Sequence, residues 1–259
     1  MIISASRRTD IPAYYSDWMI ERLRDGHVDV RNPMNYHQIS HVDLSPDSVD
    51  CIVFWSKDPN NIMDKLDTID RMGHDYYFQF TLTPYRNDIE PNLRDKDDII
   101  RTFKELSERV GKERVVWRYD PIILNDDFTE SWHIEKFKQF YNELSDHTEE
   151  CFISFVDMYP KLRKLERNGI IRTIDENEKL RMIDSFGDVA NDIKLSVCCE
   201  LPGHNGSCID RERIKRITSR DLVSKGKTYQ RPLCNCSKSI DIGTYGSCKA
   251  GCVYCYAKK

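Results

Sequence analysis

The sequence contains no long hydrophobic run, and several other common features are also missing. No stretch approaches 18 uninterrupted apolar residues, so a membrane-spanning helix is not expected. The start lacks the charged region, apolar core and small-residue cleavage site of a secretory signal. A P-loop, a GxGxxG fingerprint and an internal repeat are absent. We therefore expect a cytoplasmic protein with no membrane partner.

Cysteine is abundant, and its distribution predicts a metal site. Structural disulfides are rare in a reducing compartment. Cys51 and Cys151 each open an apolar run, where we expect buried thiols that act as small hydrophobic side chains. The other eight lie in the last quarter of the chain, where clustering indicates metal binding. They are Cys198, Cys199, Cys208, Cys234, Cys236, Cys248, Cys252 and Cys255.

The charge of the chain is also uneven. The whole chain carries −4, but from Arg211 to Lys259 twelve Lys or Arg residues face three Asp or Glu, a formal +9. A basic segment is typical of a nucleic-acid or phosphate partner. The same charge could instead compensate bound thiolates and an inorganic cluster, together with a solvated helix face. Both interpretations stay open.

Short apolar runs alternate with amphipathic helical patterns along most of the chain. The runs begin at residues 2, 51, 76, 114, 151 and 193, with a shorter candidate at 27–33. This rhythm predicts an α/β fold with a parallel sheet, in the form of a full or partial (β/α) TIM-like barrel. A doubly wound open sheet is the alternative. Within one structural domain, residues 1–200 would form the barrel, and the cysteine-rich residues 201–259 would pack on its rim.

Polar side chains collect where the predicted strands end, which is where a parallel barrel places its chemistry. Period-two alternation puts Gln79, Thr81 and Thr83 on one face of their run and Phe78 and Phe80 on the other. An ion-pair network could explain so many polar groups, but we favour a cofactor and substrate pocket. The candidate cofactor-binding residues are Arg7, Arg8, Asp10, Lys57, Gln79, Thr81 and Thr83. The candidate catalytic residues are Arg118, Asp120 and Glu200.

Three cysteines, Cys248, Cys252 and Cys255, lie on one short stretch in a CxxxCxxC pattern. Three thiolates can hold a [4Fe–4S] cluster and leave one iron open for a ligand. An open coordination position is typical of a metal that performs chemistry, whereas a closed one is typical of a structural metal. The pattern therefore predicts a reactive iron–sulfur centre.

This motif resembles that of radical S-adenosylmethionine (SAM) enzymes, and "GCVYCYA" is similar to the branch that includes spore photoproduct lyase. The resemblance implies that the three cysteines bind a [4Fe–4S] cluster and that SAM chelates its open iron. Reductive cleavage of SAM would then start radical chemistry on a substrate, with flavodoxin or ferredoxin as electron donor. Those enzymes carry the motif after their first barrel strand. Circular permutation would explain its C-terminal place here, with "SKSIDIG" forming a strand beside "MIISAS".

A second resemblance covers nearly the whole chain. "ISASRRTDIPAYY", "IVFWSKDP", "WRYDPIIL" and "CNCSKSIDIGTYGSCKAGCVYCYA" resemble a family catalogued as a domain of unknown function, which implies no substrate. That resemblance also aligns Cys198 and Glu200 with a Cys–x–Glu pattern.

Four further cysteines could form a second, closed metal site. Alternation along "KLSVCCE" places Cys198 on the polar face and Cys199 on the packing face. The expected ligands are therefore Cys198, Cys208, Cys234 and Cys236. A second [4Fe–4S] cluster would relay electrons, whereas zinc would be structural. Two other functions stay open: a zinc- or iron–sulfur-binding module for nucleic acid or phosphate, and a SAM-free electron-transfer protein.

Overall fold

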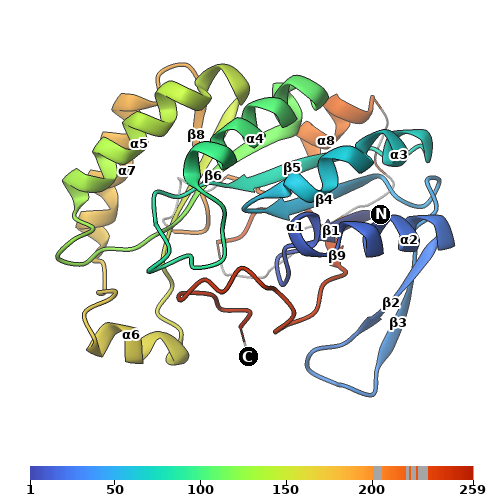
Figure 1. The fold of residues 1–259 in the computed structure, drawn as a ribbon, viewed down its shortest axis with the longest axis horizontal. Helices are drawn as coiled ribbons and strands as arrows, with labels where there is room; N and C mark the ends of the chain where they lie inside the picture. The colour runs from blue at the N-terminus through green and yellow to red at the C-terminus, as the bar shows by residue number, and fades with distance from the viewer. Residues whose placement is uncertain (201–205, 220–221, 223–225, 227–232, 259) are drawn as a thin grey trace.

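A seven-stranded parallel sheet forms the centre of the molecule (Figure 1). The computed structural model describes residues 1–200, 206–219, 222, 226 and 233–258. The strand order is β8-β7-β6-β5-β4-β1-β9, and every neighbouring pair is parallel. The strands are β1 (Ile2–Ala5), β4 (Cys51–Ser56), β5 (Tyr76–Thr81), β6 (Val115–Ile122), β7 (Glu150–Phe155), β8 (Lys194–Val197) and β9 (Ser239–Asp241).

Helices follow most of these strands, as the alternating pattern predicts. They are α1 (Ile11–Tyr14), α2 (Ser16–Asp25), α3 (Leu66–Arg71), α4 (Lys96–Val110), α5 (Glu130–Leu144), α6 (Arg163–Arg167), α7 (Glu176–Val189) and α8 (Arg211–Thr218). Short 3₁₀ turns cover Pro59–Lys65, Lys112–Arg114, Ser145–His147 and Pro160–Leu162. Asp10 is the N-cap of α1, since its carboxylate accepts a hydrogen bond from Ala13 N.

The two faces of the sheet pack against different parts of the chain. Phe78 belongs to the main core with residues of α2, α3, α4, α5 and α7, and these helices cover one face (Figure 1). The other face carries Val53, Tyr77 and Val116, which pack against Cys208 and α8. The predicted alternation along β5 is therefore confirmed, with Gln79 on the face away from the main helix layer. The C-terminal third of the chain supplies the cover for that face.

The sheet is open, so the full barrel, one of the two forms expected, is not observed. Among the described residues, β8 and β9 are its two edges and do not pair with each other. From β9 to β8 the strands follow one another in a single direction, whereas a doubly wound sheet reverses its order part-way. The boundary expected at residue 201 falls outside the described residues, and β9 from the C-terminal segment is itself a strand of the sheet.

The strand predicted near residue 27 is present, but not in the main sheet. β2 (His27–Arg31) pairs in antiparallel fashion with β3 (Ile39–Asp43), and the two form a hairpin that projects from the body (Figure 1). The connection between them is too short for the crossover that parallel neighbours need. Arg31, at the end of β2, therefore does not lie at the carboxyl edge of the main sheet.

The first and last strands lie side by side. β9 pairs with β1 in parallel, with Ile3 opposite Ile240. The Asp241 carboxylate at the end of β9 accepts hydrogen bonds from Ser4 Oγ (3.0 Å), Ser6 Oγ (2.7 Å) and Arg7 N (2.9 Å). The predicted neighbourhood of "SKSIDIG" and "MIISAS" is confirmed, and the segment after Asp241 starts at the carboxyl edge of the sheet.

Candidate metal and ligand site

The CxxxCxxC motif lies on a closed loop that we call the cysteine loop, residues 246–257. Gly246 N donates to Ala257 O at 2.8 Å, which closes the loop at its base. Val253 N donates to Ile89 O at 3.0 Å, and Asn92 Nδ2 donates to Lys249 O at 2.8 Å. Gly251 has φ +74°, and a Cβ there would lie 2.9 Å from Asn92 Nδ2, so this position favours glycine. The loop is thus held at both ends and against the segment that follows β5.

Two predicted rim residues, Asp10 and Lys57, lie beside the cysteine loop. The Asp10 carboxylate accepts from Lys57 N at 2.8 Å, and its burial raises its pKa to about 6. Burial likewise raises the pKa of Cys248, although the backbone N–H groups of Ala250 and Asp10 act in the opposite direction. The ends of β1 and β4 therefore meet the first thiol of the motif.

A buried carboxylate, Glu90, links this region to the motif. Glu90 accepts from Lys57 Nζ (2.8 Å), Thr83 Oγ1 (2.9 Å) and Lys96 Nζ (2.6 Å), and also from the hydroxyl of Tyr254. Burial alone would raise the pKa of Glu90, but the two ammonium groups outweigh it and lower the pKa to about 2. Glu90 was missed from the sequence, because its partners are up to 164 residues away.

Burial raises the pKa of two thiols of the cysteine loop, Cys248 and Cys252, and so favours their protonated form at neutral pH. Burial raises the pKa of Cys252 to about 12, although nearby Lys57 acts in the opposite direction. Metal binding requires thiolates, so it must release protons here. The Lys57 ammonium beside Cys252 is placed to compensate negative charge on a thiolate ligand.

A second group of five thiols, which we call the thiol cluster, covers the face of the sheet opposite the main helix layer. Cys198 Sγ and Cys208 Sγ lie 3.3 Å apart. Further side-chain contacts join Cys208 to Cys236, Cys236 to Cys234, and Cys234 to Cys199. All four cysteines predicted for the second site are thus brought together. In the described part of the chain, no three His, Cys, Asp or Glu side chains already surround one point as metal ligands do.

The alternation argument for Cys199 is wrong. β8 ends at Val197, so the period of two does not extend to Cys199, which has φ +58°. Its thiol contacts both Cys198 and Cys234 and thereby belongs to the thiol cluster. The alternation was extended past the end of the strand, which the sequence analysis did not identify.

One candidate catalytic residue, Arg118, lies against the thiol cluster, and a second, Asp120, pairs with it. Arg118 Nη1 donates to Cys208 Sγ at 3.0 Å and to Gln79 Oε1 at 3.2 Å, and Arg118 Nη2 donates to the Asp120 carboxylate. Gln79 Nε2 also donates to Cys208 O at 2.7 Å. For Cys208, contact with Cys198 lowers the pKa, but contact with Cys236 and burial raise it, and the result is about 11. The predicted polar face of β5 and β6 therefore supports the cysteines.

Two buried donors near the thiol cluster have no hydrogen-bond partner among the described residues. They are Arg7 Nη1 and Trp55 Nε1. The guanidinium of Arg7 lies 4.8 Å from the centre of the Trp55 ring, and that of Arg118 lies 5.2 Å from it. Unpaired buried donors cost free energy, so they indicate an acceptor that is not part of the described chain. Trp55 was not selected from the sequence, because it reads as an ordinary core residue of an apolar run.

Three predicted site residues, Arg8, Thr81 and Glu200, remain to be placed in the structure. Arg8 Nη1 donates to Gly243 O at 3.5 Å, near the start of the segment that leads to the cysteine loop. Thr81 ends β5 opposite Arg118 in the strand register. Glu200 accepts from Ser154 Oγ (3.0 Å) and Lys179 Nζ (2.7 Å), so its carboxylate ties β7 to α7.

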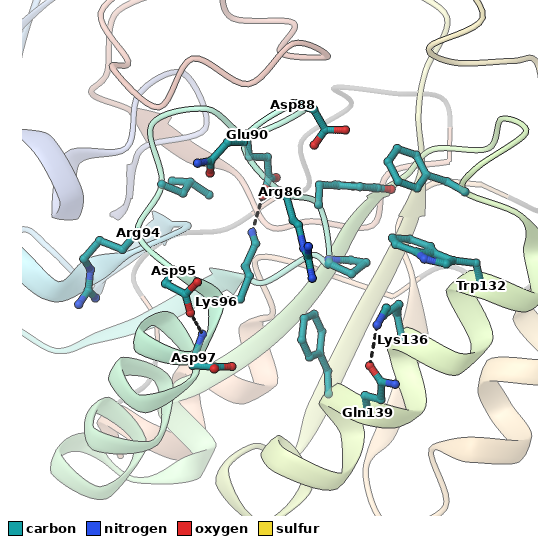
Figure 2. Close-up of a pocket in the computed structure, with 16 residues that line it drawn as sticks. Arg86, Asp88, Glu90, Arg94, Asp95, Lys96, Asp97, Trp132, Lys136 and Gln139 are labelled. Carbon is teal, nitrogen blue, oxygen red and sulfur yellow. Dashed lines mark hydrogen bonds and ion pairs between the residues drawn. The ribbon is translucent and has the colours of Figure 1, made fainter.

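A cavity of about 990 Å³ has Glu90 in its lining (Figure 2). Glu90 and Lys96 meet on one side of it, and Trp132 and Lys136 of α5 lie on the other (Figure 2). Its charged lining is balanced, with four cations and four carboxylates. The lining cations are Arg86, Arg94, Lys96 and Lys136, and the carboxylates are Asp88, Glu90, Asp95 and Asp97.

With the geometry established, comparison with known proteins identifies the family. A family model described as a domain of unknown function (DUF1848) matches residues 2–257. The chain belongs to the DUF1848 family. No curated protein and no solved structure matches it. The resemblance to a domain-of-unknown-function family is thereby confirmed, and membership assigns no activity. None of the helices in the part that the structure describes has the length and apolarity needed to cross a bilayer.

Proposed function

We propose that this DUF1848 protein is an iron–sulfur redox enzyme of the radical SAM type, acting on an unknown substrate. The observation that carries the proposal is the order of the strands. Counted from β9, the sheet runs β9, β1, β4, β5, β6, β7, β8, so a chain opened before β9 would have its strands in sequential order. The cysteine loop would then follow the first strand, as the motif does in radical SAM enzymes. We interpret the open sheet as a permuted, partial (β/α) barrel.

Cys248, Cys252 and Cys255 would hold the [4Fe–4S] cluster. When bound, such a cluster supplies the electron for reductive cleavage of SAM. The chain around it fits an anionic group, because Lys57 lies beside Cys252 and the two ammonium groups of Lys57 and Lys96 outnumber the single carboxylate of Glu90. Tyr254 is buried between these thiols and Glu90, and so excludes water from the last part of the motif.

Arg7 and Trp55 support a ligand site near the thiol cluster. Arg7 Nη1 and Trp55 Nε1 are donors without a described partner, and both suit a carboxylate or phosphate oxygen. SAM carries a carboxylate, and a substrate could carry either group. Arg118 and Asp120, both on β6, would orient the ligand. The catalytic roles of Arg118, Asp120 and Glu200 remain part of this proposal.

The thiol cluster would hold a second centre. Cys198 Sγ and Cys208 Sγ lie 3.3 Å apart. This distance is close to the roughly 3.8 Å between two thiolates on one tetrahedral zinc ion, and shorter than expected for thiolates that bind different irons of a cluster. This contact favours structural zinc as a second candidate beside a relay [4Fe–4S] cluster. Five thiols are available for four positions, and Arg118 would compensate part of the thiolate charge in either case.

Two other functions predicted from the sequence compete with this proposal. A nucleic-acid- or phosphate-binding module would use the cysteines for structure only, and a SAM-free electron-transfer protein would use them for redox alone. The buried donors Arg7 Nη1 and Trp55 Nε1 favour a protein with a small-molecule ligand.

The proposal is tested by anaerobic reconstitution of wild type and of Cys252→Ala. We expect the variant to lose about four irons per chain, because the loop loses one of three ligands, while its circular dichroism spectrum is unchanged. Cys151→Ala is the matched control, since Cys151 is fully buried in the main core, away from both cysteine groups. Equal iron content in the Cys252→Ala and Cys151→Ala proteins would contradict the assignment.

A further inference from the structure

A basic segment, residues 159–172, packs directly on the cysteine loop. Leu162 and Ile171 are buried in the same apolar cluster as Cys252 and Tyr254. Lys161 Nζ donates to Lys258 O at 3.0 Å and also to Tyr256 O. Helix α6 of this segment and the C-terminus lie at the same edge of the molecule (Figure 1). The outer surface of the basic segment is therefore continuous with that of the cysteine loop.

The charge of this segment is opposite to that of the chain. It contains five Lys or Arg residues and one Glu, whereas the whole chain carries −4. Lys161 and Arg172 are used internally, since Arg172 pairs with Glu178 at 2.7 Å. Arg163, Lys164 and Arg167 are exposed and have no ion-pair partner among the described residues. Three cations of one short helix are thus available to an acidic partner.

Aromatic side chains are exposed beside these cations. Tyr159 is 37% exposed and Tyr256 is 40% exposed, and their ring centroids lie 6.1 Å apart. They are two of five large hydrophobic side chains that are exposed among the described residues, and the other three lie on the β2–β3 hairpin or its turn. Aromatic residues bordered by arginines are typical of protein interfaces.

We propose that this surface docks a small acidic electron-carrier protein of the flavodoxin or ferredoxin class. The inference rests on the proposed function, because the carrier would deliver its electron to a cluster on the cysteine loop. One electron leaves the reduced carrier and enters the oxidised cluster, and no bond is made or broken. Complementary charge steers the encounter, and contact with Tyr256 places the carrier next to the loop. A position next to the cysteine loop suits a partner that delivers an electron, whereas binding of a nucleic acid does not require it.

Two charge-reversal variants of equal charge test the docking surface. Arg163→Glu/Arg167→Glu changes α6, and Arg24→Glu/Lys138→Glu changes two exposed cations on α2 and α5. Reduced flavodoxin is mixed with each reconstituted protein, and bleaching of the cluster is followed by stopped flow. We expect the second-order rate constant of the α6 variant to fall about tenfold or more at low salt. The control should match wild type, and high salt should remove the difference.

Two further measurements separate docking from the proposed function. Dithionite should bleach wild type and both variants equally, and no bleaching of wild type would refute the iron–sulfur proposal itself. Calorimetric titration of metal-free protein with oxidised flavodoxin and ferredoxin tests docking without a cluster, and we expect binding about tenfold weaker in the α6 variant. Equal binding or equal rates in the two variants would overturn the docking proposal. So would an α6 variant that keeps carrier binding and loses affinity for a DNA duplex.

Discussion

Replacing Glu90 tests whether a buried charge network holds the cysteine loop in place. Glu90 is fully buried and joins Lys57, Lys96 and Tyr254 through one carboxylate. In Glu90→Ala, two ammonium groups lose their carboxylate partner in a region from which water is largely excluded. Removing one member of a buried ion pair typically costs about 3–5 kcal/mol.

The pKa of Glu90 gives a similar magnitude for the stabilisation that this carboxylate provides. The fall from the ordinary value of 4.5 to about 2 corresponds to about 3 kcal/mol of stabilisation. Because the folded-state pKa is depressed, this stabilisation is fully present above about pH 4.5 and is lost as the pH falls toward 2. We therefore expect Glu90→Ala to lower the free energy of unfolding at pH 7 by about 3–5 kcal/mol.

Urea unfolding of metal-free protein, followed by circular dichroism at pH 7, measures this loss. Glu143→Ala is the matched control, because Glu143 pairs with Lys104 at 2.6 Å but is 52% exposed. Such a surface pair is worth less than about 1 kcal/mol. If Glu90→Ala does not fold, Glu90→Gln keeps an acceptor for Tyr254 and should show a smaller loss. Equal losses at Glu90 and Glu143 would refute the reasoning.

Three other predictions concern Cys236, His133 and Asp241. Cys236→Ala should remove the second metal centre and leave the first, which metal counts and electron paramagnetic resonance would show; loss of both centres together would contradict two separate sites. Burial lowers the pKa of His133 to about 4, so stability should decrease as the pH falls from about 6.5, and a His133→Gln protein with the same pH dependence would exclude this cause. Asp241→Ala should lower iron loading, because the end of β9 loses its bonds to Ser4 and Ser6; unchanged loading would show that these bonds do not position the cysteine loop.

The sequence predicted the regular parts of this molecule well. The six main strand candidates all form strands of the sheet, because buried parallel strands leave clear apolar runs. The pairing of β9 with β1 was also predicted, from the position of the motif. The sequence did not decide between a full and a partial barrel, since nothing in an apolar run records whether the two edge strands pair with each other.

The irregular parts were harder to predict. The prediction for Cys199 was wrong because Cys199 itself adopts a left-handed backbone conformation after β8, and this changes the direction of its side chain. Glu90 and Trp55 act through contacts across the fold, so no local pattern marks them. Asp241 carried a usable signal, since an acidic residue ending a short strand before the cysteine motif could have been read as an anchor.

The most direct test of the central claim is the formation of 5′-deoxyadenosine from SAM. Wild type and Cys252→Ala would be reconstituted anaerobically, reduced with dithionite and incubated with SAM, and the products separated by chromatography. The account predicts 5′-deoxyadenosine with wild type and none above background with Cys252→Ala. A wild-type protein that carries its full iron content and forms no 5′-deoxyadenosine would contradict it.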